Sequence, residues 1–214
     1  SRNRLSRAVD AEGNQTTYSY DVGNQLIAIK DAKGHITSYQ YDELGRQIST
    51  TDALGHVTRT EYDKLGNVVA AVDANSNRTE YSYDALNRRV SVKDANSGIT
   101  TTSYDKVGNV LGVTDALLRT TSYNYDALDR QISLTDALGH TSTSVYNAVG
   151  NIISTTDALN RTTSYSYDNL NRRIATIDAL NQTQSVTYDK IGNVLSATDE
   201  LGHVTNYGYD SLDR

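Results

Sequence analysis

A tyrosine recurs every 21 residues along almost the whole chain, and this period restricts the possible folds more than any other feature. The tyrosines are Tyr20, Tyr41, Tyr62, Tyr83, Tyr104, Tyr125, Tyr146, Tyr167, Tyr188 and Tyr209. An aspartate follows each of them except Tyr146, where Asn147 stands. A second aspartate series has the same period: Asp10, Asp31, Asp52, Asp73, Asp94, Asp115, Asp136, Asp157, Asp178 and Asp199. Self-similarity at a fixed period indicates units that pack mainly on their neighbours. We therefore expect residues 1–214 to be a single array of about ten repeats, truncated within a repeat at both ends.

Each unit contains two similar turn motifs of the form Asp-x-Leu-Gly-polar, seen at positions 42–46 and again at positions 52–56. Asp at the first position of a type I turn accepts backbone N–H groups, and Gly at the fourth tolerates a left-handed backbone. Where that Gly is replaced after Tyr-Asp, the residue is one that tolerates the same conformation: Asn87, Asp129, Asn171 or Asp213. Leu118 is an exception, and we expect a distorted turn there. In the first unit, Gly23 comes one residue early.

The segments between the turns, such as 56–62 and 68–72, are rich in Thr, Tyr, Val and Ile and contain no Pro, which is typical of strands. They predict an all-β antiparallel meander with two strands per unit and about 20 strands in all. A three-residue loop with a Gly bulge at the Asp-Ala turn would place Ile48 opposite Thr60. The loop at the Tyr-Asp turn should then have the other parity, that is, an even number of residues. Otherwise side chains of one row would change from one face of the sheet to the other. The turn signals are too closely spaced to leave room for helices.

A longer period, twice the first, distinguishes two kinds of unit. Arg-type units have an extra Tyr before the repeat Tyr and an Arg at the end of the turn: Tyr39 with Arg46, Tyr81 with Arg88, Tyr123 with Arg130 and Tyr165 with Arg172. Asn-type units lack the extra Tyr and have Gly-Asn there, ending at Asn67, Asn109, Asn151 and Asn193. One interpretation is that the guanidinium lies over the ring of the extra Tyr in its own unit. The other is duplication of a two-unit ancestor without energetic coupling.

The composition follows from the repeat and excludes several classes of protein. The chain has 16 Tyr but no Cys, Pro, Met, Trp or Phe, so disulfide scaffolds and zinc fingers are excluded. The two aspartate series hold 19 of the 26 acidic residues, so the net charge of −6 is a by-product of the turns. An acidic chain is not expected to bind nucleic acid. The longest apolar run, 68–72, is far shorter than the roughly 20 residues of a membrane helix, so no membrane insertion is expected.

The candidate binding residues all have simpler explanations in the turns and strands. The four histidines, which share one turn position, could hold a metal or be exposed polar residues: His35, His56, His140 and His203. The aspartate rows could bind calcium, but turn capping already explains them. Four Asn-x-Thr sequons begin at turn residues, namely Asn14, Asn77, Asn160 and Asn181. The tyrosine rows could stack on sugars or pack within the sheet. Because every candidate is copied many times, we expect no catalytic site, no cofactor and no metal, and hence not an enzyme.

The motif pair at positions 41–46 and 51–56, Tyr-Asp-x-Leu-Gly-Arg followed by Thr-Asp-Ala-Leu-Gly-His, closely resembles the YD-repeat or RHS (rearrangement hot spot) family. The structural positions of the repeat are then Tyr41, Asp42, Gly45, Asp52, Gly55, Tyr62, Asp63, Gly66, Tyr83, Asp84, Tyr104, Asp105, Tyr125, Asp126, Tyr167, Asp168, Tyr188 and Asp189. The resemblance implies secreted or cell-surface bacterial proteins whose YD repeats wind into a solenoid-like hollow shell or tube. In toxin members the shell encloses a C-terminal toxic domain. The family's Pro-containing core motif is absent, since the chain has no Pro.

These observations predict a non-enzymatic structural scaffold of a secreted or cell-surface protein, part of a β-shell that encapsulates a toxin domain. One alternative is an extracellular structural or adhesive filament built from a long array. A further alternative is a carbohydrate-binding repeat surface. The expected partners are further repeats of the same or like chains, paired through strand edges, and an enclosed toxin domain.

Overall fold

The computed structural model describes residues 4–210, 212 and 214, which form twenty β-strands and no helix. These residues fall into two compact units. The first comprises the residues up to Thr102 together with Asp115–Leu118, and the second comprises Ser103–Thr114 and the residues from Arg119 onward. No helix among the described residues is long and apolar enough to cross a membrane.

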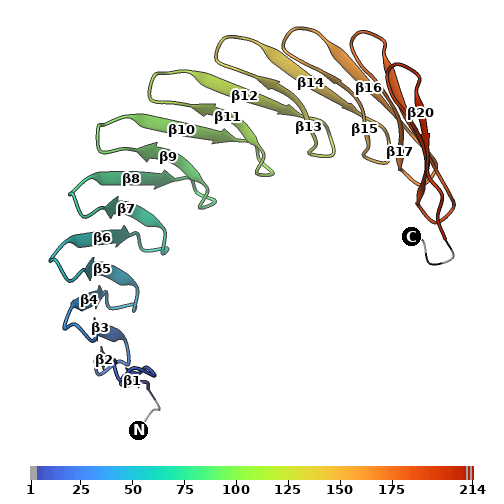
Figure 1. Cartoon of the computed structure of the whole chain (residues 1–214). Helices are drawn as coiled ribbons and strands as arrows, with labels where there is room; N and C mark the ends of the chain where they lie inside the picture. Colours follow the sequence, from blue (N-terminus) through green and yellow to red (C-terminus); the bar gives the residue numbers. More distant parts are fainter. Residues whose placement is uncertain (1–3, 211, 213) are drawn as a thin grey trace. The chain divides into compact units, whose positions relative to one another are not determined.

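In the first unit, consecutive strands pair antiparallel in chain order (Figure 1). The strands are β1 (Arg7–Val9), β2 (Gln15–Tyr20), β3 (Leu26–Lys30), β4 (Ile36–Tyr41), β5 (Gln47–Thr51), β6 (Val57–Tyr62), β7 (Val68–Val72), β8 (Arg78–Tyr83), β9 (Arg89–Lys93) and the first residues of β10 (Ile99–Tyr104). The predicted antiparallel meander is confirmed in this unit.

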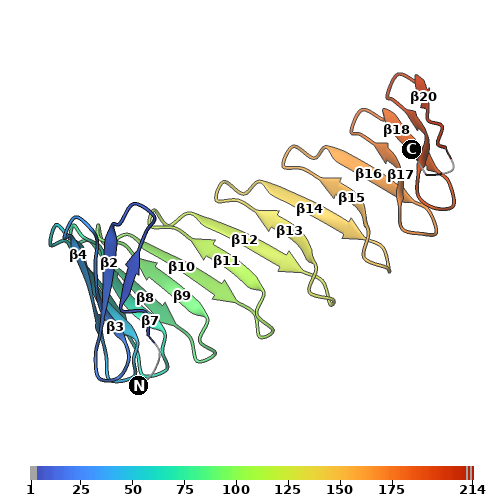
Figure 2. The same cartoon turned by 60° about the horizontal axis from the view of Figure 1, so that its bottom comes forward.

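The second unit repeats the arrangement, and each hairpin lies beside the hairpin before it (Figure 2). Its strands after β10 are β11 (Val110–Thr114), β12 (Thr120–Tyr125), β13 (Gln131–Thr135), β14 (Thr141–Tyr146), β15 (Ile152–Thr156), β16 (Thr162–Tyr167), β17 (Arg173–Ile177), β18 (Thr183–Tyr188), β19 (Val194–Thr198) and β20 (Val204–Asn206). In both units the Tyr-Asp turns lie at one rim of the sheet and the Asp-Ala turns at the opposite rim, since turns alternate along a meander. We call these the Tyr-Asp rim and the Asp-Ala rim.

The Asp-Ala turn has the predicted three-residue loop. Between β5 and β6, the N–H of Gly55 donates to the carbonyl of Asp52 at 3.0 Å and the N–H of Asp52 donates to the carbonyl of His56 at 2.9 Å. Gly55 has a left-handed φ of 87°, which glycine adopts without steric cost. The strands pair with Ser49 opposite Arg59 and Thr50 opposite Thr58, the register that a three-residue loop sets.

The prediction that the Tyr-Asp turn has a loop of different parity from the Asp-Ala turn is wrong. Its loop is the same, because Gly45 donates to the carbonyl of Asp42 and Asp42 donates to the carbonyl of Arg46, both at 3.0 Å. The register shifts in the strand instead: Gln40 pairs with Ser49, but the next residue, Tyr41, pairs with Gln47. This β-bulge inserts one extra residue into β5 and so does what a different loop would have done. The same shift occurs before each repeat Tyr of β2, β6, β8, β12, β14, β16 and β18.

The expected distortion at Leu118 is also wrong. The N–H of Leu118 donates to the carbonyl of Asp115 at 2.9 Å, as in the other turns. The turn keeps its geometry by placing Leu118 at a φ of 61°, in the left-handed region that disfavours side chains with a Cβ. The cost therefore falls on the backbone conformation of one residue. In the first repeat of the sequence, Asn24 rather than Gly23 takes the left-handed position, with φ at 81°.

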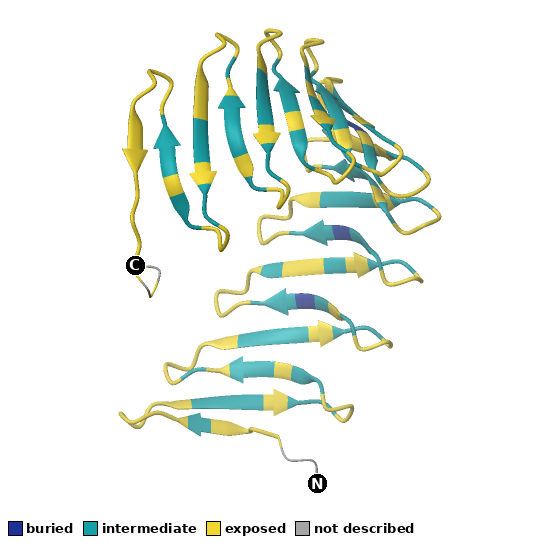
Figure 3. Cartoon of the chain, turned by 90° about the vertical axis from the view of Figure 1, so that its right-hand side faces the viewer, coloured by how far each residue is buried: buried dark blue, intermediate teal, exposed yellow. Residues whose placement is uncertain are grey.

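Few described residues are buried, because each unit is a sheet without a second layer over it (Figure 3). The buried ones are Ser49, Ala70 and Gly112. Strand side chains are mostly half-buried against their neighbours, whereas the turns are exposed. Stability must then come from the strand ladders and from contacts between adjacent repeats rather than from a central core.

Candidate functional site: the contacts that join successive repeats

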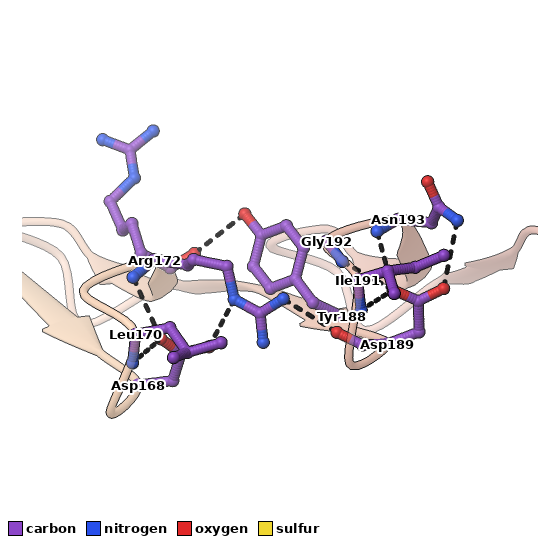
Figure 4. Close-up of polar contacts among 9 residues, drawn as sticks. Asp168, Leu170, Arg172, Tyr188, Asp189, Ile191, Gly192 and Asn193 are labelled. Carbon is purple, nitrogen blue, oxygen red and sulfur yellow. Dashed lines mark hydrogen bonds and ion pairs between the residues drawn. The ribbon is translucent and has the colours of Figure 1, made fainter. Parts of the chain in front are cut away.

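Most turns are organised by the carboxylate of their first residue, as Figure 4 shows for Asp168. One oxygen of Asp168 accepts the backbone N–H of Leu170 at 2.9 Å and that of Arg172 at 3.0 Å. The other oxygen accepts Nε of Arg172 at 2.7 Å. The backbone bond from Arg172 and its guanidinium both favour the charged carboxylate, so the pKa of Asp168 lies below its usual value. Both oxygens are therefore occupied within the turn.

Arg172 also reaches the next repeat, which it joins through two contacts (Figure 4). Its Nη1 donates to the backbone carbonyl of Asp189 at 2.8 Å. Its guanidinium lies over the ring of Tyr188, 4.6 Å from the ring centroid. The hydroxyl of Tyr188 in turn donates to the carbonyl of Arg173 at 3.2 Å. We call Arg172, Asp168, Tyr188 and the carbonyl of Asp189 an arginine clasp.

The same clasp recurs in other Arg-type units. Arg46 donates to the carbonyl of Asp63 at 3.0 Å and lies 4.5 Å from the ring centroid of Tyr62. Arg130 donates to the carbonyl of Asn147 at 3.0 Å and lies 4.6 Å from the ring centroid of Tyr146. The clasp accepts Asn147 in place of the usual Asp because it uses the backbone carbonyl of that residue.

The structure corrects which tyrosine each arginine contacts. The sequence suggested the extra Tyr of the same unit, Tyr39 for Arg46, but the guanidinium lies over Tyr62 of the following unit instead. Likewise, the predicted pairs Tyr123 with Arg130 and Tyr165 with Arg172 are replaced by pairs with Tyr146 and Tyr188.

The extra tyrosines have other neighbours. Arg89, the residue after Arg88, lies 5.6 Å from the ring centroid of Tyr81, and Arg173 lies 5.7 Å from that of Tyr165. The reason is that the turn already fixes the preceding arginine: Arg88 donates to Asp84 at 2.8 Å, as Arg172 does to Asp168. That pairing directs the guanidinium along the rim, whereas the following residue belongs to the strand and lies beside the extra Tyr.

Asn-type units are joined to the next repeat by a different contact. Nδ2 of Asn67 donates to Oδ1 of Asn87 at 3.0 Å, and Nδ2 of Asn109 donates to Oδ1 of Asp129 at 2.9 Å. The acceptors occupy left-handed turn positions, with φ at 60° for both. Asn and Asp combine tolerance of that conformation with a side-chain acceptor. The third example is Asn151 with Asn171, at 2.9 Å.

These two contacts give the two-unit period a physical basis. An Arg-type turn contacts the following Asn-type unit through the arginine clasp, and an Asn-type turn contacts the following Arg-type unit through an asparagine bridge. Reasoning from the sequence missed the bridge, although a signal was present: after the first repeat, every unit in which the Gly after Tyr-Asp is replaced is of the Arg type.

The repeat tyrosines tie each unit to the preceding one by their hydroxyl groups. Tyr41 donates to the carbonyl of Leu26 at 2.8 Å, Tyr83 to that of Val68 at 2.8 Å, and Tyr167 to that of Ile152 at 2.8 Å. Tyr125 makes the equivalent bond to Val110 at 3.0 Å, and Tyr104 lies at the same place at the end of β10. With one face of several rings occupied by arginine, the tyrosine rows act in packing between repeats.

The remaining candidates lie at the exposed rim and are not gathered into a site. Each histidine pairs with the aspartate of its own turn: His56 Nδ1 lies 2.8 Å from Asp52, and His140 Nδ1 lies 2.9 Å from Asp136. Within the part of the chain that the structure describes, no three His, Asp or Glu side chains come together as a metal site would require. Among the sequon residues, Asn77 donates to Asp73 at 2.8 Å, while Asn160 and Asn181 occupy left-handed turn positions; Asn14 donates to Asp10 at 2.9 Å.

Comparison with known proteins agrees with this arrangement. The family model described as RHS Repeat matches positions 1–36, 22–57, 62–99, 104–141, 146–183 and 188–214, and the last four matches begin at every second unit. No curated protein sequence matches the chain. Among solved structures, the Photorhabdus luminescens Tc holotoxin pore is similar with a TM-score of 0.51 and 18% identity, over 99% of this chain and 14% of that one.

The crystal structure of TcdB2-TccC3-Cdc42 is similar with a TM-score of 0.41 and 17% identity, over 97% of this chain and 16% of that one. The chain thus spans a small part of the length of these proteins, and at such identities the likeness concerns the fold. The family model covers most of the sequence, and its period is visible in the strands and in the contacts between repeats. The chain belongs to the RHS repeat family.

Proposed function

We propose that this chain is a segment of the wall of a hollow β-shell that encloses a toxin domain in a secreted or cell-surface bacterial protein. The observation that carries the proposal is a sheet that needs no second layer: its strand side chains are mainly half-buried, and its repeats are joined laterally by clasps and bridges. Such a wall can face water on one side and an enclosed volume on the other. The fold likeness to a Tc holotoxin pore supports this choice.

Electron microscopy of the native protein that carries this array, combined with limited proteolysis, tests the proposal. A closed hollow particle, with a domain resistant to protease until the particle is unfolded, is the expected result. An extended filament, or a toxin domain cleaved at the same rate in the intact and the unfolded protein, would overturn encapsulation.

A second candidate function, an extracellular structural or adhesive filament, is favoured by the uniformity of the joints. The arginine clasps at Arg46, Arg130 and Arg172 hold the guanidinium at nearly the same distance from the ring centroid, with values of 4.5 Å, 4.6 Å and 4.6 Å. Equal joints suit a structure that extends without a closing end. The micrographs described above separate the two functions directly.

A further inference from the structure

One hollow in the second unit lies where the repeat changes. Its volume is about 660 Å³, and it lies on β14, β15 and β16 beside the Asp-Ala turns at Asp157 and Asp178. Ser142 and Ser144 form part of its lining. In the other repeats the residue equivalent to Ser142 is Thr, or Gln at position 184, and the residue equivalent to Ser144 is Tyr, Thr or Val. The two smaller side chains lower the surface at this repeat, and the volume is within the roughly 300–1,000 Å³ of small-molecule sites.

The floor of the hollow consists of hydroxyl groups on one face of the sheet. Thr155 pairs with Ser144 on one side and with Thr163 on the other, so the three side chains share a face. Ser142 joins them, because it lies two residues before Ser144. Among the described residues, none forms a side-chain hydrogen bond with the hydroxyl of Ser142, Ser144 or Thr163. Three hydroxyl oxygens are therefore available to a donor from outside the chain.

The charges in the lining leave one carboxylate oxygen available as well. Oδ1 of Asp178 accepts the backbone N–H groups of Leu180 and Gln182, both at 2.8 Å. In most Asp-Ala turns the second oxygen is filled by His, Arg or Asn at the position of Gln182, but Oδ2 of Asp178 has no partner within the described part of the chain. Arg161 is neutralised by Asp157, to which its Nε donates at 2.7 Å. The lining therefore keeps one uncompensated negative charge, on Asp178.

We propose that this hollow binds a primary alkylammonium group, which either a small amine or a lysine side chain of a polypeptide can supply. An ammonium group has three donors and no acceptor, so it matches a site with hydroxyl oxygens and one free carboxylate oxygen. Ala179 and Leu180 also line the hollow, and they offer apolar surface to the methylene groups of the same ligand. An anion would meet the carboxylate of Asp178 instead. The inference stands independently of the proposed shell.

Binding at this place is weak and depends on salt. Leu180 is 77% exposed, so the ligand stays in contact with water. An ion pair in such a place contributes little, and salt at 0.1 M screens charges over about 10 Å. The affinity should therefore lie in the millimolar range at low salt and fall as salt is added.

Titration of the isotope-labelled whole chain with butylamine at neutral pH and low salt, followed by amide chemical shifts, is the test. The amides of Ser142, Ser144 and Leu180 should shift. Butanol, which has the alkyl chain without the charge, should leave them in place. Nα-acetyl-lysine amide separates the two sources: tighter binding than butylamine assigns the site to a lysine of a polypeptide, and weaker binding assigns it to a free amine.

Two variants with opposite expected effects examine the charges. Asp178→Asn should weaken butylamine binding about fivefold, the upper range for an exposed ion pair. The turn should tolerate this change, since the side chain of Asn147 accepts the equivalent backbone N–H groups in its own turn. Arg161→Gln should tighten binding, because it frees the carboxylate of Asp157, and Gln182 shows that glutamine fits this turn position. Circular dichroism checks that the variants fold.

Asp199→Asn is the matched control, because Asp199 begins the next Asp-Ala turn and does not line the hollow. This variant should bind butylamine like the unaltered chain. Absence of the amide shifts, equal weakening by Asp178→Asn and Asp199→Asn, or weaker binding by Arg161→Gln would overturn the proposal. The same shifts produced by calcium chloride at a lower concentration than butylamine would also overturn it, since a metal ion would then be the ligand.

Discussion

The arginine clasp makes a quantitative prediction about coupling between repeats. Arg172 lies 4.6 Å from the ring centroid of Tyr188, and its side chain is 26% exposed. A guanidinium over a tyrosine contributes about 0.5–1 kcal/mol when exposed and about 2 kcal/mol when desolvated, so we expect about 1 kcal/mol here. The perturbation is a double-mutant cycle that combines Arg172→Ala with Tyr188→Leu.

The assay is urea unfolding followed by far-ultraviolet circular dichroism and by tyrosine fluorescence, which is suitable because the chain contains no Trp. With a slope of about 1–3 kcal/mol per molar urea, a coupling of about 1 kcal/mol corresponds to a non-additive midpoint shift of about 0.3–1 M. The slope should be equal in all four proteins. Tyr188→Phe retains the ring but loses the hydroxyl bond to Arg173, so its cycle with Arg172→Ala should show little coupling.

The decisive comparison is with the pair that the sequence suggested. Arg172→Ala combined with Tyr165→Leu should be additive within about 0.5 kcal/mol, because Tyr165 lies beside Arg173 instead. Additivity for Arg172 with Tyr188, or equal coupling for the two tyrosines, would refute the reasoning.

Three further predictions concern stability. Leu118→Gly should stabilise the protein by about 1 kcal/mol in urea unfolding because it relieves the left-handed backbone at a φ of 61°; destabilisation would contradict the strain. Ile132→Lys should lower the unfolding free energy more than Gln131→Lys, since Ile132 is half-buried and Gln131 exposed, and equal losses would contradict the burial. The turn carboxylates, among them Asp52 and Asp168, have a lowered pKa in the folded chain. The stabilisation by these carboxylates is therefore complete above the unfolded pKa of about 3.9 and is lost as the pH falls through the lower folded values. An acid titration in which the unfolding free energy begins to fall well above pH 5 would contradict a stabilising role of the turn carboxylates.

The period of the sequence was enough to predict the strands, because turn residues recur at fixed positions and leave room only for short extended segments. The Asp-x-Leu-Gly motif carries its own conformation, and so the loop around Asp52 and Gly55 could be predicted in detail. The β-bulge before Tyr41 could not be predicted in this way. It lies inside a strand, where an extra residue has no marker in the sequence. Only the requirement that side chains of one row stay on one face of the sheet indicates that an extra residue is needed between the two turns.

The partner of each arginine could not be predicted for a different reason. In a strictly alternating array, Arg46 is associated equally well with features of its own unit and of both neighbouring units. Co-occurrence of Tyr39 with Arg46 therefore cannot decide which ring is contacted. What decides is the turn, since Asp42 holds the guanidinium at the rim, where Tyr62 and the carbonyl of Asp63 are within reach.

The two kinds of joint differ in what they require of the next unit. An arginine clasp needs a tyrosine ring and a backbone carbonyl, which every complete unit supplies. An asparagine bridge needs a side-chain acceptor at the left-handed position, which Asn87 offers and the glycine of an Asn-type turn such as Gly66 does not. Gain or loss of a pair of units by recombination leaves every joint matched, whereas loss of one Arg-type unit leaves an asparagine facing a glycine. A change of length in steps of two therefore keeps both kinds of joint, which favours the pair of units, rather than the single repeat, as the structural building block.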